Sequence, residues 1–410
     1  MNFWDDLYAT GKPVLGLSPM DGVTDAAMRY MTAKYGSSYS RISVNQYSQI
    51  GVKQENGLTD SLIYEGVDII FTEFVSVDAL KHAKEEKSVD RVMRAFIRAK
   101  DVFTYTSKSV NQCTQSGTKL DYGLTDSRIH DHWPHEIAQV FGHTPELFYQ
   151  AAVMIATLGF DGMDINMGCP AHKVEEQGSG AGLIRFPVVA QEIVRQSKQA
   201  MVDFAEGKVT IDDLDISPMT RDWVKSHSGS KVPKEILPVS VKTRIGVDKI
   251  VVEEWMETLM EVKPANISLH GRTLKQLYQG SADWEAIGRA AEIVHKHGGH
   301  ILGNGDITSL NDLRDKASRY GVDGGLIGRC AEGNPEVFIG NDNPSIEQRK
   351  AWMVEHAQVY EKIFGEGNFM PMRKHLAWYC KGFPGAVELR TKLMQTNSAD
   401  EVREIVGEIN

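Results

Sequence analysis

Short apolar runs rich in β-branched residues recur along the chain, and longer amphipathic stretches lie between them. Runs of this kind are typical of buried strands, whereas the stretches have the periodicity of helices. Their alternation predicts an α/β fold built on a parallel sheet. The eight predicted strands are Val14–Ser18, Asp68–Phe74, Glu136–Phe141, Asp161–Asn166, Ile236–Thr243, Ala265–His270, His300–Asn304 and Asp323–Gly328.

The amphipathic stretches predict helices between the strands, at residues 145–158, 187–202, 250–261, 283–297 and 310–320. After Pro335 the β-branched runs become few and a helical pattern takes over. We therefore predict a catalytic domain at residues 1–342 and a small all-helical domain at 343–410. Three stretches are longer than such a sheet needs and are predicted as insertions in loops or outer helices. They lie near residues 36–66, 85–134 and 204–233.

Residues capable of chemistry follow the predicted strands, at the point where each strand ends. An open doubly wound sheet would string these residues along one edge, whereas a closed eight-stranded barrel brings them to one mouth. Their convergence favours a TIM (β/α)8 barrel. The segments are Ser18-Pro19-Met20, Gln139, Asn166 to Pro170, Lys242-Thr243-Arg244, His270-Gly271-Arg272, Asn304-Gly305-Asp306 and Gly328-Arg329.

Composition and charge limit the class of protein. Hydrophobic residues make up 41% and charged residues 24%, which excludes a disordered or fibrous chain. A net charge of −10 argues against an indiscriminate nucleic-acid coat protein. Residues 369–393 nevertheless carry five basic side chains against one acidic side chain. This stretch is either a solvated helix face or a local binding face for nucleic acid.

Cysteine and histidine positions give no sign of a disulfide framework or a metal site. The four cysteines contain no CxxC pair, and this suits a reducing cytosol. The acidic start of the sequence and the lack of a run of 18 apolar residues lead us to expect a cytoplasmic protein without a membrane span. Two groups of histidines occur in the sequence, and we expect neither to bind a metal. The first is His130, His132 and His135, and the second is His295, His297 and His300.

A cysteine follows the fourth predicted strand in Asn166-Met167-Gly168-Cys169-Pro170. A buried structural cysteine is one interpretation. Glycine before Cys169 and proline after it predict a stiff turn at the barrel mouth, where a thiol can serve as nucleophile or acid. Because an ordinary thiol is mostly protonated near neutral pH, it can donate a proton as readily as it can attack.

Lysine and glycine-rich segments at other strand ends indicate an anionic ligand. Lys242 ends an apolar run, so it is either the Schiff-base lysine of an aldolase or a cation beside an anionic cofactor ring. Asn304-Gly305-Asp306 and Gly328-Arg329 are tight turns or a phosphate site, and their place after the last two strands favours phosphate. Residues 178–182 read GxGxG rather than GxGxxG, so a separate dinucleotide-binding domain is not indicated.

Taken together, these segments resemble the tRNA-dihydrouridine synthase family of bacterial type, flavin enzymes that reduce uridine in tRNA. The resemblance runs from about residue 13 to 400. The segments that carry it are Leu17 to Asp25, Phe71 to Ser76, Asp164 to Pro170, Val241 to Arg244, His270 to Thr273, Tyr278 to Trp284, Asn304 to Ile307, Ile327 to Arg329 and Arg373 to Tyr379.

The resemblance implies a role for each matching residue. Cys169 is the expected catalytic acid. The residues expected to bind FMN are Ser18, Pro19, Met20, Gln139, Lys242, His270, Asn304, Gly305, Asp306, Gly328 and Arg329. The residues expected to bind the tRNA substrate are Asn166, Lys173, Arg272, Arg373 and Lys374.

The implied reaction passes a hydride from flavin N5 to C6 of uracil, while Cys169 protonates C5. The target base leaves its stack to reach the barrel mouth, and the basic helical domain grips the phosphates around it. NADPH, or NADH, reduces the flavin in a separate half-reaction, and we expect a monomer. Two alternatives remain open: an FMN barrel that acts on a free pyrimidine, and a non-catalytic RNA-binding protein on a degenerate barrel.

Overall fold

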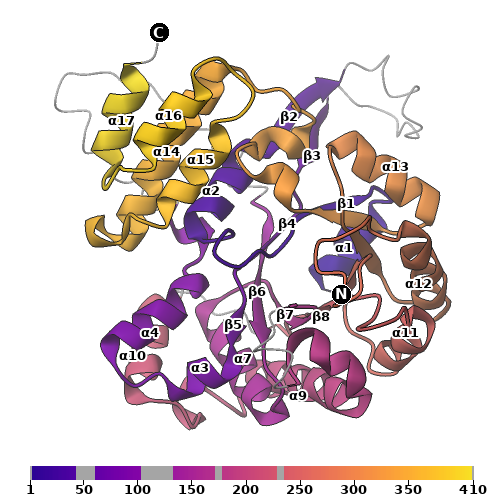
Figure 1. The fold of residues 1–410 in the computed structure, drawn as a ribbon. Helices are drawn as coiled ribbons and strands as arrows, with labels where there is room; N and C mark the ends of the chain where they lie inside the picture. Colours follow the sequence, from indigo (N-terminus) through magenta and orange to yellow (C-terminus); the bar gives the residue numbers. More distant parts are fainter. Residues whose placement is uncertain (1, 43–60, 103–132, 171–177, 229–234, 409–410) are drawn as a thin grey trace.

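The computed structural model describes residues 2–42, 61–102, 133–170, 178–228 and 235–408, and within them eight parallel strands close into a barrel (Figure 1). Pairing of β4 with β6 and of β1 with β11 completes the ring. The predicted TIM barrel is confirmed. Its strands are β1 (Val14–Leu17), β4 (Ile69–Phe71), β6 (His135–Phe141), β7 (Gly162–Met167), β8 (Val239–Arg244), β9 (Ile267–His270), β10 (Ile301–Asn304) and β11 (Gly324–Ile327).

One end of the barrel is plugged by apolar side chains. Helix α1 (Phe3–Ala9) places Trp4 in a buried cluster with residues from the starts of several strands, including Val14, Ile69 and Ile137. Burial of this kind stabilises the closed ring and fills the end where the strands begin. The opposite end, where the strands finish, is therefore the end available for a ligand site.

Helices cover the outside of the barrel. Two of them, α7 (Pro145–Leu158) and α13 (Leu310–Tyr320), have the predicted bounds. Each ends before a glycine in the left-handed conformation, which leaves helical geometry without a steric penalty. The other outer helices are α2 (Ala26–Tyr35), α3 (Val77–His82), α4 (Glu86–Met93), α9 (Pro187–Ala205), α10 (Pro218–His227), α11 (Val252–Met260) and α12 (Trp284–Lys296).

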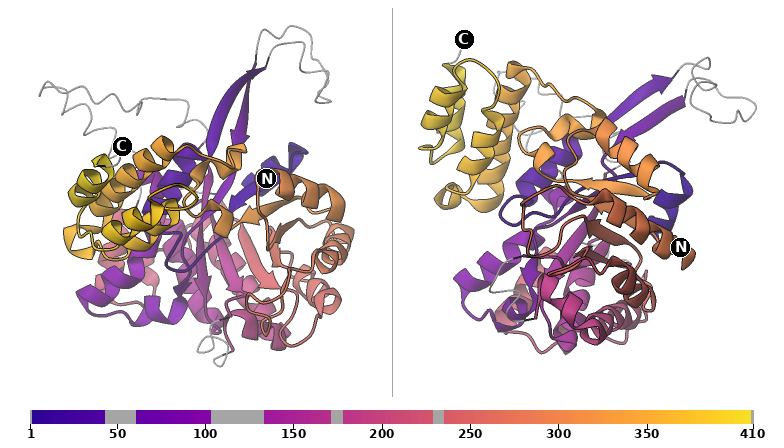
Figure 2. Two further views of the ribbon diagram at one scale, coloured as in Figure 1. Left: turned by 45° about the horizontal axis from the view of Figure 1, so that its top comes forward. Right: turned by 45° about the vertical axis from the view of Figure 1, so that its right-hand side comes forward.

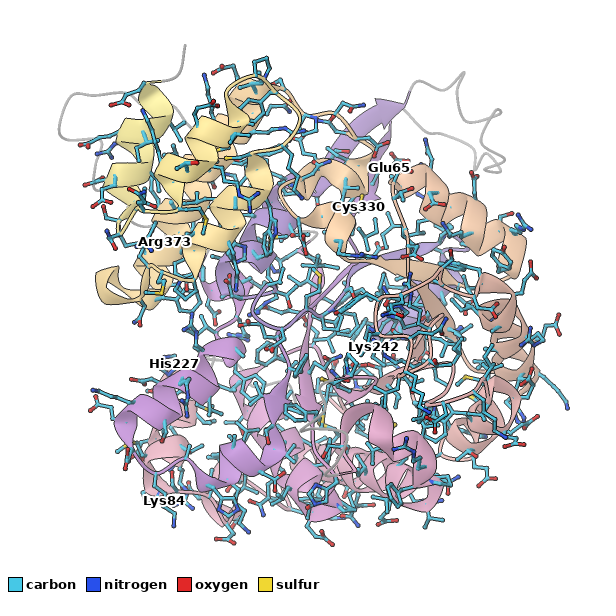
Figure 3. All side chains as sticks on the ribbon, in the orientation of Figure 1. Glu65, Lys84, His227, Lys242, Cys330 and Arg373 are labelled. Atoms are coloured by element: carbon cyan, nitrogen blue, oxygen red, sulfur yellow. The ribbon has the colours of Figure 1, made fainter. Side chains whose placement is uncertain are left out.

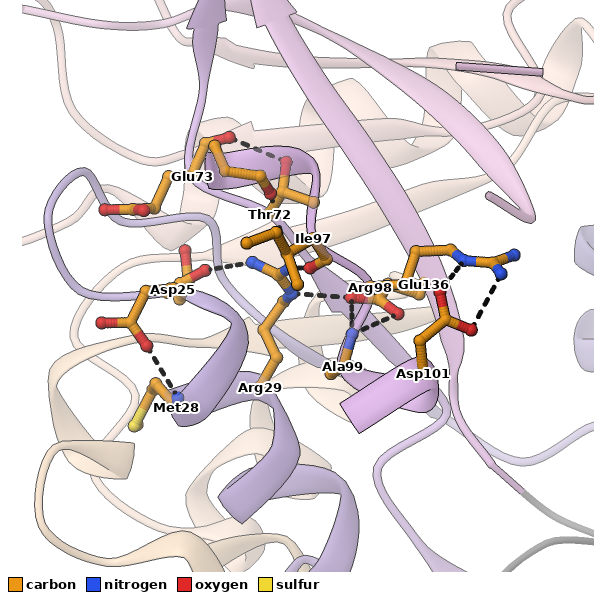
Figure 4. Close-up of polar contacts among 12 residues, drawn as sticks. Asp25, Met28, Arg29, Thr72, Glu73, Ile97, Arg98, Ala99, Asp101 and Glu136 are labelled. Carbon is orange, nitrogen blue, oxygen red and sulfur yellow. Dashed lines mark hydrogen bonds and ion pairs between the residues drawn. The ribbon is translucent and has the colours of Figure 1, made fainter. Parts of the chain in front are cut away.

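A buried ion pair ties α2 to the barrel wall (Figure 4). The guanidinium of Arg29 donates to the Glu136 carboxylate over 2.8 Å and to the carbonyl of Thr24 over 2.6 Å. The backbone N–H of Ala99 also donates to Glu136. Because both charged side chains are almost completely buried, each depends on the other for compensation of its charge.

Four C-terminal helices pack together beside α2 (Figures 1 and 2). They are α14 (Ile346–Phe364), α15 (Met372–Tyr379), α16 (Ala386–Leu393) and α17 (Ala399–Gly407). Ion pairing of Lys34 with Glu355 over 2.6 Å joins α2 to α14. The predicted helical C-terminal region is present, and the domain boundary at residue 342 stays a prediction.

The predicted insertions lie only partly within the described residues. Strands β2 (Ser37–Ile42) and β3 (Ser61–Gly66) form an antiparallel hairpin that projects from the barrel (Figure 2). In the third stretch, α10 packs against α4 and α7. No helix of the described part of the chain is long and apolar enough to cross a membrane.

Candidate active site

A cavity of about 500 Å³ opens at the carboxyl ends of the barrel strands. Figure 3 shows Lys242 within the ring of strands, whereas Arg373 lies on the C-terminal helices. Most of the side chains predicted from strand ends line this one cavity. They are Ser18, Pro19, Met20, Asn166, Cys169, Lys242, His270, Arg272, Asn304, Gly305, Asp306, Gly328 and Arg329.

The turn after β7 holds Cys169 in the cavity wall. The side-chain oxygen of Asn166 accepts hydrogen bonds from the backbone N–H groups of Gly168 and Cys169, both over 2.9 Å. The guanidinium of Arg244 donates to the Gly168 carbonyl over 2.7 Å. With its donors and its carbonyl engaged in this way, the turn keeps the thiol in a fixed place beside the cavity.

Beneath this turn lies a row of buried polar side chains. The Gln139 amide donates to Asp164 over 2.6 Å and accepts from the amide of Asn166 over 3.0 Å. Asp164 also accepts the Ser240 hydroxyl over 2.6 Å, yet burial raises its pKa to about 6. Gln139 is completely buried and does not line the cavity. Through its hydrogen bond it holds Asn166, which in turn holds Cys169. Its contact with a ligand stays a prediction.

Lys242 presents a cation to the cavity. Its ammonium donates to the side-chain oxygen of Asn304 over 3.3 Å, and the Asn304 amide is fixed by the carbonyl of Leu326 over 2.8 Å. Burial, with a smaller contribution from the positive charge of Arg244, lowers the pKa of Lys242 to about 8. The side chain is therefore still mostly cationic at neutral pH.

His270 is neutral beside this cation. Burial lowers its pKa well below the usual value, and the charges of Lys242 and Arg244 act in the same direction. A guanidinium nitrogen of Arg272 lies 3.4 Å from its Nε2 atom. Since guanidinium can only donate, this geometry makes Nε2 the acceptor and leaves the proton on Nδ1.

Two arginines share one carboxylate at the far side of the cavity. Asp306 accepts from Arg272 over 2.6 Å and from Arg329 over 3.0 Å. Arg272 is buried and also donates to the carbonyls of Gln279 and Gly280, whereas the Arg329 side chain is 62% exposed. Two guanidinium groups against one carboxylate leave net positive charge, which suits a phosphate.

Three residues predicted to bind tRNA lie outside the cavity wall or outside the described residues. Arg373 donates to the carbonyl of Thr396 over 2.8 Å and to the Asn397 side chain over 2.7 Å. Lys374 lines a second cavity of about 430 Å³, which shares Asp21 and Phe74 with the first. Lys173 lies outside the described residues.

The cavity also contains side chains for which the sequence predicted no binding or catalytic role, notably Arg244, Tyr278 and Phe74. Arg244 is two residues beyond Lys242 on β8, and alternate residues of a strand share a face. The two-residue period of the strand could therefore have assigned Arg244 to the same side of the cavity wall as Lys242. Tyr278 is exposed at the mouth, and its ring centre lies 5.8 Å from the Arg329 guanidinium.

A closed α/β barrel with a ligand-sized cavity at the carboxyl ends of its strands is the architecture of a TIM-barrel enzyme. The chain belongs to the dihydrouridine synthase family, Dihydrouridine synthase (Dus), whose sequence profile matches residues 16–213 and 221–409. The resemblance inferred from the sequence is thereby confirmed.

Relatives with named activities match over most of their length. The probable tRNA-dihydrouridine synthase 1 of Synechocystis sp. is 30% identical over 66% of this chain and 69% of its own. The probable tRNA-dihydrouridine synthase 2 of Bacillus subtilis is 27% identical over 99% of this chain and 96% of its own. A probable tRNA-dihydrouridine synthase of Staphylococcus aureus is 26% identical over 99% and 95%.

Proposed function

We propose that this protein is an FMN-dependent tRNA-dihydrouridine synthase that reduces the C5=C6 bond of specific uridines in tRNA with electrons from NADPH or NADH. Family membership and the names of the relatives support the activity and the substrate. One structural observation carries the assignment of the site. Asn166, which holds Cys169, is the register partner of Lys242 on the next strand, so the thiol and the cation belong to the same cavity wall.

The residues present fit FMN. A cavity of about 500 Å³ is within the usual range for a cofactor or small-molecule site. Gly328 has no side chain, and a methyl group there would lie 3.6 Å from the Met20 sulfur and 3.8 Å from Cβ of Ser18. Glycine thus keeps open the space beside the segment expected to face the flavin ring.

Charge is arranged to suit the two ends of that cofactor. Lys242 offers an ammonium to the ring, and Arg329 offers its exposed guanidinium to the phosphate. The other residues that would hold the cofactor are Ser18, Pro19, Met20, Gln139, His270, Asn304, Gly305, Asp306 and Gly328.

The bound flavin would supply a hydride to C6 of the uracil ring. Cys169 would supply the proton at C5. Asn166 would hold the turn so that the thiol meets the base at a fixed distance. Lys242 would balance negative charge that accumulates in the cavity when electrons enter it.

The target base must leave its stack in the tRNA to enter this cavity. Lys173, Arg272, Arg373 and Lys374 would contact the RNA, and the cavity beside Lys374 shares Asp21 and Phe74 with the cavity at the barrel mouth. The choice of NADPH or NADH, the monomeric state and the cytoplasmic location stay predictions from the sequence.

The experiment is a titration of the purified, FMN-free protein with FMN, followed by anaerobic addition of NADPH and then of unmodified tRNA. We expect saturable FMN binding, bleaching of the flavin absorbance by NADPH, and its recovery on addition of tRNA. A protein that takes up no FMN, or whose reduced flavin is not reoxidised by tRNA, would overturn the proposal.

A further inference from the structure

The C-terminal helices contact the loop at residues 18–25, which begins in the cavity wall, through one buried pair of polar side chains. A carboxylate oxygen of Asp25 lies 3.1 Å from Nε2 of His375 on α15. The other carboxylate oxygen accepts the backbone N–H of Met28 over 2.9 Å and so caps the start of α2 (Figure 4). Both side chains are almost completely buried. Asp25 is thus fixed from two directions, by its own helix and by the C-terminal helices.

The loop that ends at Asp25 begins in the cavity wall. Ser18 and Met20 line the cavity, and the Met20 carbonyl accepts the N–H groups of Val23 and Thr24, both over 3.0 Å. The Thr24 hydroxyl also contacts the backbone N–H of Met20 over 3.1 Å. These bonds close residues 20–24 into one turn, which links Asp25 to Met20 over a short, hydrogen-bonded segment.

Helix α15 touches the same loop a second time, through the residue next to His375. The Lys374 ammonium lies where a methyl group on Gly22 would be 3.1 Å away. Gly22 has a φ of +66°, a conformation that favours glycine, so the loop turns closely under the lysine. Helix α15, which carries Arg373 and Lys374, therefore contacts the loop both at Gly22 and at Asp25.

The contact with Asp25 is the main polar contact of the His375 side chain. Its Nδ1 atom has no hydrogen-bond partner among the described residues. Although burial alone would raise the pKa of Asp25, the neighbouring His375 holds it well below its usual range. The adjacent His356 bonds to the Tyr379 hydroxyl over 3.0 Å and stays within the C-terminal helices. Burial, with the nearby His375, lowers the pKa of His356 to about 3.

We propose that His375 is a positioning residue for the reaction: through Asp25 it sets the place of the Ser18–Met20 cavity wall, so that the RNA-facing helix α15 and the cavity move as one unit. This inference rests on the proposed function for its effect on turnover. The contact itself predicts that the loop at residues 18–25 is protected from hydrogen–deuterium exchange. This protection can be measured without cofactor or substrate.

The first measurement is hydrogen–deuterium exchange of the full-length, FMN-free protein, read in peptides covering residues 18–25. We compare His375→Phe, which removes the donor, with His375→Gln, whose amide N–H can replace Nε2. His356→Gln is the matched control, because His356 is equally buried in the same helices but bonds to Tyr379. We expect faster exchange of this loop in His375→Phe, and wild-type exchange in the other two variants.

The second measurement is steady-state reduction of tRNA by the holoenzyme. We expect kcat of His375→Phe to fall about tenfold to a hundredfold with little change in KM for tRNA, and His375→Gln to recover most of it. Lys374→Ala should raise KM for tRNA, because it removes a cation expected to contact the RNA.

Wild-type loop exchange in His375→Phe would overturn the inference, and so would a wild-type kcat in a variant whose loop exchange has risen. If His375→Phe does not fold, His375→Asn replaces it, since its shorter amide does not extend to the position of Nε2. A wild-type protein that reduces no uridine would refute the proposed function instead, and the exchange experiment would still decide whether His375 holds the loop.

Discussion

The ammonium of Lys242 donates to the side-chain oxygen of Asn304 over 3.3 Å, which joins β8 to β10 past the strand between them, β9. Because burial lowers the pKa of Lys242 to about 8, its charge is present at neutral pH and is lost as the pH rises through about 8. A bound anion favours the charged form and so raises this pKa again.

Affinity for FMN is therefore expected to weaken as the pH rises through about 8. Free protein above that pH must take up a proton at Lys242 to offer its cation to the ligand, and this uptake costs binding free energy. Titration of the FMN-free protein with FMN from pH 6 to 9 measures the effect. Lys242→Met should bind more weakly and without this pH dependence; equal dependence in both proteins would remove Lys242 from the binding site.

Cys169→Ala is expected to keep FMN and its reduction by NADPH but to lose tRNA reduction by about 10²-fold to 10⁴-fold, the usual contribution of a general acid. Rapid mixing of reduced protein with tRNA measures the rate. Cys330→Ala removes a different thiol, one that lies 2.8 Å from the Thr308 carbonyl, and serves as the control. Full activity of Cys169→Ala would exclude the thiol as proton donor.

Arg329→Ala is expected to weaken FMN binding by about tenfold to a hundredfold, the range for a lost hydrogen bond to a charged group. Riboflavin, which lacks the phosphate, should bind the variant and the wild type alike. Arg319→Ala, which removes an exposed arginine paired with Glu285, is the control. If riboflavin and FMN lost the same affinity, Arg329 would not be contacting the phosphate.

Glu136→Ala is expected to destabilise the protein by about 3 to 5 kcal/mol, because Arg29 would remain buried without its partner. Urea unfolding followed by circular dichroism measures the free energy. Glu285→Ala breaks an exposed pair with Arg319 and should change stability by no more than about 1 kcal/mol. Similar losses in both variants would show that the buried pair has no special role.

The barrel strands could be predicted because strands buried on both faces need continuous apolar, β-branched runs. Their ends were harder to predict. The run 68–74 was expected as one strand, but β4 ends at Phe71 and a short strand, β5 (Val75–Ser76), follows. The cause is local: the Gln139 N–H bonds to the Thr72 hydroxyl over 3.0 Å, so a side chain takes the place of the backbone ladder there.

The convergence of the site residues could also be predicted, because the carboxyl ends of parallel barrel strands meet at one mouth. The directions in which these side chains point, and the extent of their burial, could not be predicted from the sequence. Gln139 comes from a strand of that barrel, yet its amide is engaged below the cavity by Asp164 and Asn166. Arg272 was expected to contact RNA phosphates, but it is buried and paired with Asp306, and its role towards RNA stays a prediction.

The central claim is that this cavity reduces uridine in tRNA, and mass-spectrometric mapping of tRNA after incubation with the FMN-loaded protein and NADPH tests it most directly. We predict that defined uridines gain the mass of two hydrogen atoms, and that the gain is absent when Cys169→Ala replaces the wild type. Oxidation of NADPH with every uridine unchanged in mass would contradict the account.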